Sequence, residues 1–460
     1  PGRYRAWATV DGRRLSRTYG PRLRGAACPM PGPPISWADR SAGPLTASPY
    51  GPPLSSPPLP FKPGPEPLSG TAPRRSALHR SALRRSAPRT PHPLPLTVAM
   101  PPLTAHRSAP AGTPPDVAAH LSRFRLTLPD LLTSSNPKLA KGATVARSVI
   151  LHHLPARALA AAITPGHRGA TAPRSYLADL AALADVTGTA AAAKRWHGCP
   201  WATAGCAAGC LNWAGHGGLS PAVASARGRR TLAMLANPQI YGRAVLWAIA
   251  RAWAQAQAQD LPLAVRLRGT DEGPAIGWHR LAVPVTLADA ATLSHRYGLM
   301  IAPGCHHSLA AALSVPRAEG TLTLYDYSKA PLSGPLGLTA QAAAGWDITA
   351  SMAADRLTAA ADAAAALRAG YRLAVPVALR KGAALPRALE ILPHRSFAPL
   401  IVPAVDGDAT DHRWQDPGAV AVILRTKVSR GADRSLADRF SLAPTPDPQP
   451  LSDGTARLIW

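Results

Sequence analysis

The middle of the chain alternates between two hydrophobic periods, one typical of strands and one typical of helices. Short apolar runs predict strands over 145–154, 263–268, 321–327, 346–352, 371–379 and 420–427. Apolar residues three and four positions apart predict helices over 174–194, 221–235, 238–259 and 353–369. Strands that alternate with helices favour an α/β fold, with a mostly parallel sheet or partial barrel and flanking helices.

Two of these helices carry a start signal in the sequence. Ser220-Pro221 and Asn237-Pro238 each place a capping residue directly before a proline. The side-chain oxygen of Ser or Asn can accept from an unpaired backbone N–H of the first turn, and proline tolerates the first helical position because it has no N–H to leave unpaired. We expect the two helices to pack as a pair.

Residues 1–130 differ in composition from the rest of the chain. They hold 27 of the 51 prolines, and 18 Lys or Arg residues against 5 Asp or Glu. Such a segment buries too little apolar surface to offset its ordering entropy, so it is predicted to be disordered. It is either a basic arm that binds phosphates or an unstructured extension. The chain begins with Pro1, so we expect residues before Met100 not to belong to the natural protein.

A single α/β domain is predicted over 134–440, followed by a loose tail over 441–460. Within it, 196–218 forms a cysteine-rich loop and 271–320 is an insertion between two strands. The net charge of +26 is only weak support for nucleic-acid binding, because an excess of Arg, Ala and Pro is also typical of a GC-rich genome.

Cysteine usage and hydropathy predict where the protein is located. Five cysteines, with Cys28 and Cys305 isolated, do not make a disulfide framework for a chain of 460 residues. No run approaches 18 uncharged apolar residues, and no secretion leader opens the chain. The sequence therefore predicts a soluble protein in a reducing cytoplasm, without a membrane partner.

Three cysteines fall within twelve residues, at Cys199, Cys206 and Cys210, separated mainly by small residues. Three thiols on a thin backbone can converge on a zinc ion, with His216 or His197 as the fourth ligand. They can equally hold an iron–sulfur cluster and leave one iron open for a substrate. The remaining alternatives are cysteines that simply pack as small apolar residues, or a disulfide.

The carboxyl ends of parallel strands usually carry the functional groups of an α/β protein. That rule selects Thr270, Ser351 and the segment 326–329, which contains Asp326 and Lys329. Residues 406–418 add four carboxylates and an arginine, which could coordinate a hard cation, accept protons or cap a turn. No Ser–His–Asp order, glycine-rich phosphate loop or paired zinc motif supports a hydrolase or a nucleotide triphosphatase.

Five segments together resemble the phage-associated gene product 88 type of domain, over about residues 134–440. They are Asn136–Gly142, Cys199–Asn212, Ala264–Thr270, Tyr325–Lys329 and Asp406–Arg413. The resemblance implies a phage relative inside a bacterial host cell and supplies no activity. The three-cysteine loop ahead of alternating strands is also similar, more weakly, to radical S-adenosylmethionine enzymes.

The leading hypothesis is a phage-derived protein whose Cys199, Cys206 and Cys210 bind an iron–sulfur cluster. An unidentified substrate is then expected to bind at Arg266, Asp326, Lys329, Asp406, Asp408, Asp411 and Arg413. A second hypothesis is a zinc-stabilised nucleic-acid-binding protein, with the arginines of 227–230 on phosphates. A third is a structural phage protein without a metal.

Overall fold

The chain divides into two units, Pro1–Ala105 and His106–Trp460. The computed structural model describes residues 4–10, 13–19, 112–134, 137–155, 159, 174–196, 198–208, 210, 220–272, 277–379, 382–392, 398–426, 441–444, 449–451 and 454–459. In the first unit, β1 (Tyr4–Val10) and β2 (Arg13–Tyr19) form an antiparallel hairpin. Most of the segment predicted to be disordered lies outside the described residues.

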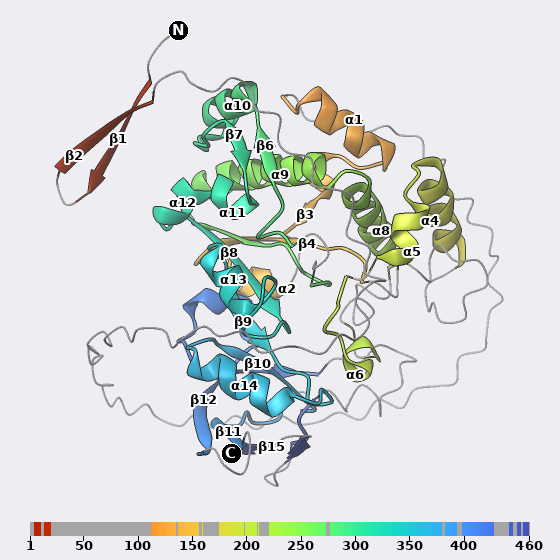
Figure 1. Cartoon of the computed structure of the whole chain (residues 1–460), viewed down its shortest axis with the longest axis vertical. Helices are drawn as coiled ribbons and strands as arrows, with labels where there is room; N and C mark the ends of the chain where they lie inside the picture. Colours follow the sequence, from red (N-terminus) through yellow and green to blue (C-terminus); the bar gives the residue numbers. More distant parts are fainter. Residues whose placement is uncertain are drawn as a thin grey trace, which may run out of the picture. The chain divides into compact units, whose positions relative to one another are not determined.

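The second unit contains helices and strands that alternate along most of its length (Figure 1). The helices are α1 (Pro115–Arg123), η2 (Leu128–Asp130), α2 (Pro137–Lys141), α4 (Arg174–Val186), α5 (Ala190–Arg195), α6 (Ala204–Ala208), α8 (Pro221–Ala236), α9 (Pro238–Gln257), α10 (Leu287–Tyr297), α11 (Leu309–Ala312), α12 (Ser314–Ala318), α13 (Leu338–Ala343), α14 (Ala359–Arg368) and η3 (Arg413–Gln415). The strands are β3 (Leu132–Thr133), β4 (Arg147–Leu151), β5 (Leu263–Arg266), β6 (Val283–Val285), β7 (Gly304–His306), β8 (Leu322–Ser328), β9 (Asp347–Ser351), β10 (Leu373–Val377), β11 (Ala388–Leu392), β12 (Leu400–Asp406), β13 (Ala421–Arg425), β14 (Gln449–Leu451) and β15 (Gly454–Ile459).

Eleven strands of this unit form one mixed sheet, in the order β14-β15-β11-β12-β13-β10-β9-β8-β5-β4-β3. The seven central strands from β12 to β4 are all parallel to their neighbours. The strands at both ends pair antiparallel. Among the described residues β3 and β14 remain as edges, so the sheet is open. The predicted α/β fold with a mostly parallel sheet is confirmed.

The strand order determines which face the helices cover. From β4 to β10 each new parallel strand is added on the same side of the one before it. Since crossovers between parallel strands are right-handed, the connecting helices must all pack on one face. Helices α9, α12, α13 and α14 contact the strands accordingly.

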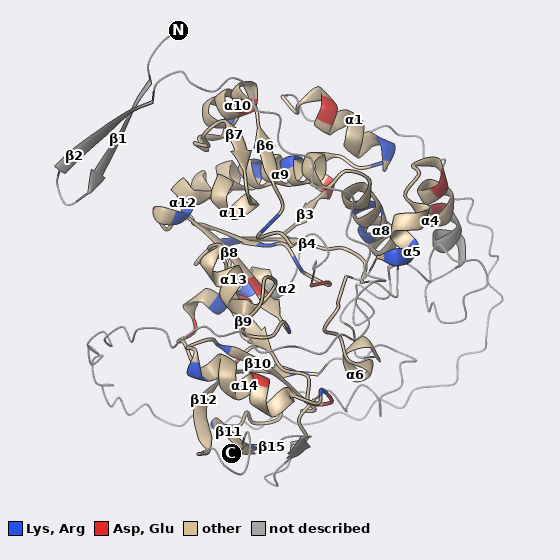
Figure 2. Cartoon of the chain, in the orientation of Figure 1, with Lys and Arg blue, Asp and Glu red and all other residues tan. Residues whose placement is uncertain are grey.

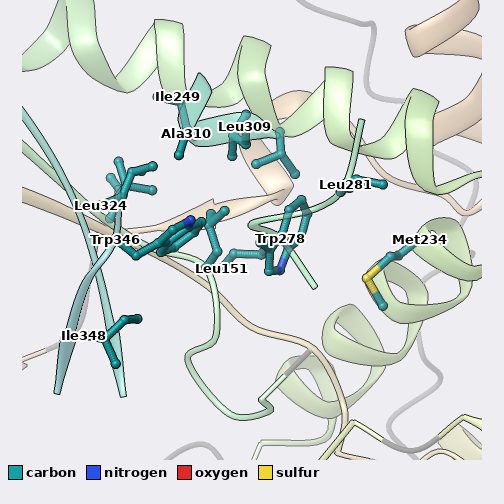
Figure 3. Close-up of a cluster of buried hydrophobic side chains, with 14 of the residues drawn as sticks. Leu151, Met234, Ile249, Trp278, Leu281, Leu309, Ala310, Leu324, Trp346 and Ile348 are labelled. Carbon is teal, nitrogen blue, oxygen red and sulfur yellow. The ribbon is translucent and has the colours of Figure 1, made fainter. Parts of the chain in front are cut away.

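The main core lies between these helices and the sheet. Figure 3 shows Ile249 of α9 and Leu309 of α11 above Leu324 of β8 and Ile348 of β9. Helix α9 is central because twelve of its residues are buried, including Trp247. Each fully buried large apolar side chain contributes about 1.5–3 kcal/mol.

The opposite face is covered by the connection from β12 to β13. This connection reverses the direction of strand addition, because β13 inserts between β10 and β12. A right-handed crossover then places it on the other face. Consistently, η3 contacts β8 and β9, and Trp414 packs against a small separate cluster of Ala146, Ala264 and Tyr325.

Three boundaries differ from the sequence-based expectation. Helix α1 contributes Val117 and Leu121 to the main core, so the folded unit begins before 134. Strand β15 pairs with β11 and buries Leu458, so 441–460 is not merely a loose tail. The expected insertion over 271–320 contains α10 and the β6–β7 hairpin, which add Val283 and Leu293 to the same core.

Candidate functional site

Four neighbouring parallel strands, β4, β5, β8 and β9, end at the same edge of the sheet, which we call the carboxyl edge. His152 and His153 follow β4, Asp271 and Glu272 follow β5, Lys329 follows β8, and Asp355 follows β9. Parallel pairing brings these residues together although they are far apart in the sequence.

The segment 198–210, which we call the thiol loop, lies against the carboxyl edge. The Glu272 backbone N–H donates to the Gly198 carbonyl at 2.7 Å. Just before the loop, Trp196 Nε1 donates to the Leu154 carbonyl beyond β4 at 3.1 Å. Gly198 is suited to this close approach, because a Cβ there would lie 3.3 Å from the Cβ of Asp271.

The β9–α14 connection also contacts the thiol loop. Thr203 Oγ1 donates to Asp355 Oδ1 at 2.6 Å, and the Gly205 N–H donates to Asp355 Oδ2 at 2.9 Å. Thr203 Oγ1 accepts from the Cys206 N–H at 3.1 Å. The start of α6, which carries Cys206, is therefore fixed by a side chain from another part of the chain.

Cys199, Cys206 and Cys210 are partly exposed and carry free thiols. Lys329 donates a hydrogen bond to the Cys206 thiol. The Lys329 Nζ lies 3.6 Å from Glu272 Oε1, and its backbone N–H donates to the same oxygen at 3.1 Å. The sequence proposed Lys329 for substrate binding, and the structure places it among the thiols.

Opposing charges shift the pKa values of these groups. Burial lowers the pKa of Lys329, but the nearby Cys206 thiol, Glu272 and the Cys199 thiol raise it by more, so it stays protonated. Burial raises the pKa of the Cys199 thiol, and Glu272, Asp271 and Cys210 raise it further. Without a bound cation, Cys199 is therefore held as a neutral thiol.

The thiols share one loop but do not form a finished metal site. Among the described residues, no three His, Cys, Asp or Glu side chains are grouped so that they could hold a metal ion. The expected convergence of three sulfurs on one point is thus not present in this arrangement. His197 and His216, the expected fourth ligands, lie outside the described residues.

Several buried polar atoms at the carboxyl edge have no hydrogen-bond partner within the described part of the chain. They are both carboxylate oxygens of Asp271, Oε2 of Glu272 and Nδ1 of His152. Buried polar atoms are nearly always paired, so unpaired ones gathered in one place indicate a position where a ligand or water binds.

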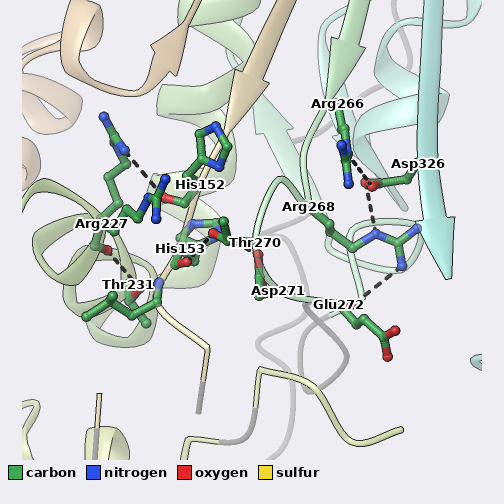
Figure 4. A network of polar contacts seen from close by, with 12 residues as sticks. His152, His153, Arg227, Thr231, Arg266, Arg268, Thr270, Asp271, Glu272 and Asp326 are labelled. Carbon is green, nitrogen blue, oxygen red and sulfur yellow. Dashed lines mark hydrogen bonds and ion pairs between the residues drawn. The ribbon is translucent and has the colours of Figure 1, made fainter. Parts of the chain in front are cut away.

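His153 connects this edge to α9. Its Nε2 lies 3.1 Å from the Tyr241 hydroxyl, and its Nδ1 lies 3.6 Å from Asp271 Oδ1. Thr270 Oγ1 donates to the His153 carbonyl at 2.6 Å, and Trp278 stacks on the His153 ring. Figure 4 shows His153, Thr270 and Asp271 together at the ends of β4 and β5.

The arginines of α8 are used inside the protein. Arg227 is buried, and Arg230 donates to the carbonyls of Asp130 and His152. Burial and the neighbouring Arg230 lower the pKa of Arg227 to about 10, against the opposing effect of Cys210. Burial and three nearby arginines, Arg227 first, lower the pKa of His152 to about 2. Arg227 and Arg230 therefore do not form the phosphate-binding surface expected from the sequence.

The other predicted substrate-binding residues lie in two separate groups. Arg266 lies 3.3 Å from Asp326 Oδ1 and 3.4 Å from Asp411 Oδ2. The hydroxyls of Tyr325 and Tyr327 also donate to Asp411, at 3.2 and 3.3 Å. These residues, which we call the Asp411 network, are largely buried beneath the β12–β13 connection.

Arg413, Asp406 and Asp408 have structural partners of their own. Arg413 is buried and pairs with Asp416 at 2.7 Å, three residues further along η3. Arg425 lies 3.5 Å from Asp406 and 3.7 Å from Asp408, at the carboxyl ends of β12 and β13. Of the seven predicted substrate residues, only Lys329 contacts the thiol loop among the described contacts.

The sequence analysis missed Asp271, Glu272 and Asp355. A signal existed for the first two, because they directly follow Thr270, which the strand-end rule selected. They were instead assigned to the start of an insertion. Asp355 lies in a turn whose sequence gives no hint of its partner, since Thr203 and Gly205 are about 150 residues away.

The distribution of charge and the hydropathy of the helices do not point to a further binding surface among the described residues. Figure 2 shows Lys and Arg distributed over several helices and strands of the second unit rather than gathered on one helix. No helix in the described residues is both long and apolar enough to cross a bilayer.

Comparison with known proteins gives one match. The family described as Gene product 88 matches residues 156–439, which include the thiol loop, the Asp411 network and the carboxyl edge apart from β4, His152 and His153. No curated protein and no solved structure matches the chain. The comparisons thus give no support for the weaker similarity to radical S-adenosylmethionine enzymes. Since the match covers more than half of the chain, this protein belongs to the Gene product 88 family of phage proteins.

Proposed function

We propose that this protein binds an iron–sulfur cluster through Cys199, Cys206 and Cys210, and a substrate beside it at the carboxyl edge. The observation that carries the proposal is that the Gly198 carbonyl of the thiol loop accepts from the Glu272 backbone N–H. This contact lies beside the Asp271 oxygens and Glu272 Oε2, which are buried and have no hydrogen-bond partner within the described part of the chain. Soft thiolates suit iron and sulfide. When bound, a cluster held by three thiolates supplies redox chemistry and one iron open to a ligand.

Two cations near the thiols balance part of the negative charge of a bound cluster, against the opposing charges of Asp271 and Glu272 beside Cys199. Three thiolates and a cluster together carry net negative charge, which must be balanced where water is excluded. Lys329 bonds to Cys206, and Arg227 is close enough to Cys210 for each to affect the charge of the other. Two cations therefore face the thiols from β8 and from α8.

The three thiols are chemically suitable ligands for a cluster, but in this structure they are not arranged around one point. The donor set is suitable, but the described residues hold no closed group of three ligands. Binding therefore requires the three sulfurs to move toward one another. Residues 211–219, which follow Cys210 directly, lie outside the described part of the chain.

The side chains of the carboxyl edge have separate roles in this proposal. Lys329 holds Cys206 and balances thiolate charge, and Glu272 fixes Lys329 through two contacts to one oxygen. The free Oε2 of Glu272 and both oxygens of Asp271 are acceptors for donor groups of the substrate. His153 lies between Asp271 and Tyr241 and connects this edge to α9.

Anaerobic purification followed by iron, sulfide and zinc analysis tests the proposal. We expect bound iron and acid-labile sulfide, with broad visible absorption. Alanine at Cys199, Cys206 or Cys210 should remove most of the iron. Ser122→Ala is the control, because Ser122 is exposed on α1 outside the thiol loop, and it should keep the iron.

Two results would contradict the proposal. A colourless protein that takes up no iron and sulfide on reconstitution would exclude the cluster. One zinc per chain, lost in the same three variants, would replace it with a zinc site. A zinc-stabilised nucleic-acid-binding protein should also lose affinity for nucleic acid steeply as salt rises. Arg227 and Arg230 predict no such loss, because Arg227 is buried and Arg230 donates to backbone carbonyls.

A further inference from the structure

The connection between β9 and α14 contacts both sides of the Cys206–Lys329 pair. Asp355 accepts from Thr203 at 2.6 Å and from the Gly205 N–H at 2.9 Å, both on the thiol loop. The next residue, Arg356, donates through Nη1 to the Lys329 carbonyl at 2.7 Å. Two consecutive residues therefore bind the backbone or side chain next to Cys206 and the backbone of Lys329, whose side chains bond to each other.

The Thr203 hydroxyl can donate one hydrogen bond and accept others, which determines how it connects Asp355 to Cys206. A hydroxyl has one hydrogen and two lone pairs. Its hydrogen is used by Asp355, so a lone pair faces the Cys206 N–H, which donates to it at 3.1 Å. Hydrogen bonds to a charged carboxylate are stronger than neutral ones. Asp355 thus orients the Thr203 hydroxyl, and the Thr203 hydroxyl in turn holds the backbone N–H of Cys206.

Arg356 is fixed in turn by α14. Its Nε lies 3.4 Å from Asp362 Oδ2, and Thr358 Oγ1 donates to the same carboxylate oxygen at 2.7 Å. The first turn of α14 thereby orients Arg356 toward Lys329. The β9–α14 connection is a rigid reference for both partners, because α14 packs into the main core through Ala360 and Ala364.

We infer that Asp355 and Arg356 are positioning residues that hold Cys206 against Lys329 and thereby set the affinity of the thiol loop for a soft metal ion. The predicted effect on metal affinity rests on the proposed function. The predicted effect on the backbone around Cys206 does not depend on it. Residues that orient metal ligands typically change affinity 10- to 100-fold when they are removed.

Hydrogen–deuterium exchange of the metal-free full chain provides the backbone readout. In Asp355→Ala, the Gly205 amide loses its acceptor and the Cys206 amide loses the fixed orientation of Thr203. We expect exchange at these two amides to accelerate about tenfold or more, since exchange reports local opening. Asp355→Asn, which keeps one acceptor oxygen, should lie between wild type and alanine. Thr203→Val should accelerate exchange at Cys206 as well.

The control is Asp185→Asn, which changes an exposed carboxylate on α4 that has no contact with the thiol loop among the described residues. It should leave exchange at Gly205 and Cys206 unchanged. Equal thermal midpoints of the control and Asp355→Asn would show that any difference is local.

Titration with Zn²⁺ alone, by competition with a chelator, provides the metal readout. We expect Asp355→Ala to weaken zinc binding about 10- to 100-fold, and Asp355→Asn to weaken it less. Unchanged exchange at Gly205 and Cys206 in Asp355→Ala would overturn the inference, and so would faster exchange with undiminished zinc affinity. If wild type binds neither zinc nor iron, the proposed function fails, and the exchange result alone decides whether Asp355 positions Cys206.

Discussion

At the residue scale, the Asp411 network is the most constrained polar group outside the thiol loop. One buried carboxylate interacts with Arg266 and accepts from the hydroxyls of Tyr325 and Tyr327. Burial lowers the pKa of Arg266, but Asp411 and Asp326 raise it by more, so the guanidinium remains charged inside the protein. The Arg266 guanidinium also lies over the Tyr327 ring, 4.5 Å from its centroid.

We predict that Asp411→Ala lowers the free energy of unfolding by about 3 kcal/mol, because it removes one of the two carboxylates paired with buried Arg266 and the acceptor of two hydroxyls. Tyr327→Phe, which removes only one hydroxyl, should cost about 1 kcal/mol. Urea unfolding followed by circular dichroism measures both changes.

Asp408→Ala is the control for Asp411, because Asp408 also lies beyond β12 but pairs with Arg425 at 3.7 Å nearer the surface. Its cost should be about 1 kcal/mol or less. Equal effects of the Asp408 and Asp411 substitutions would show that the Asp411 network does not stabilise the fold as we infer.

At the element scale, the contact between α4 and α8 depends on a glycine inside a helix. A Cβ at Gly228 would lie 2.4 Å from Leu180 Cδ1 and 2.7 Å from Leu180 Cδ2. Leu180 is buried and cannot easily move away, because Leu154 lies on the same side. Glycine at this position allows the two helices to approach each other closely.

Gly228→Ala should therefore destabilise the protein, although alanine is favoured over glycine in a helix by about 1 kcal/mol. Overpacking typically costs about 1–3 kcal/mol, so we expect a net loss of about 1 kcal/mol. Thermal unfolding of Gly228→Ala, Leu180→Ala and the double variant measures this.

The double variant decides the mechanism for Gly228. If the new Cβ collides with Leu180, the alanine at 228 should be harmless or favourable once Leu180 has been shortened, which gives a favourable coupling energy. A Gly228→Ala variant more stable than wild type would contradict the proposed close approach.

At the scale of the whole molecule, the carboxyl-terminal strands complete one side of the sheet. Strand β15 pairs with β11 from Ala388↔Ile459 to Leu392↔Thr455. Leu389 and Ile391 of β11 are fully buried, and Ala456 and Leu458 of β15 are about 1% exposed. Without β15, β11 would be an unprotected edge beside an opened core.

We predict that removal of residues 449–460 lowers the unfolding midpoint by several degrees and causes aggregation, because it exposes apolar side chains and an unpaired strand edge. Differential scanning fluorimetry and size-exclusion chromatography measure the two effects. Leu287→Ala, which shortens an exposed apolar side chain on α10, is the control and should leave the midpoint unchanged. A carboxyl-terminal deletion as stable and monomeric as the full chain would contradict the role of β15.

The sequence alone determined the central elements of the fold. Hydrophobic periods placed β5, β8, β9, β10, β13, α8 and α9 within a few residues of their observed bounds. The Asn237-Pro238 start signal corresponds to a real cap, since Asn237 accepts from the Ile240 N–H at 3.0 Å. These features depend on neighbours in the sequence, which is why local patterns predict them. Strands β11, β12 and β15 were missed because Glu390 and Pro403 interrupt the apolar runs of β11 and β12, and β15 follows a proline-rich segment.

Only the tertiary structure decided which polar residues meet. Asp326 lies in β8 and Lys329 directly follows it, three positions later. Lys329 bonds to Cys206, whereas Asp326 pairs with Arg266 and Arg268. Successive residues of a strand point to opposite faces of the sheet. A residue beyond the end of the strand no longer obeys this alternation. The sequence therefore showed three thiols close together along the chain. Whether they face Lys329, Glu272 and Asp355 depended on how four parallel strands end at one edge.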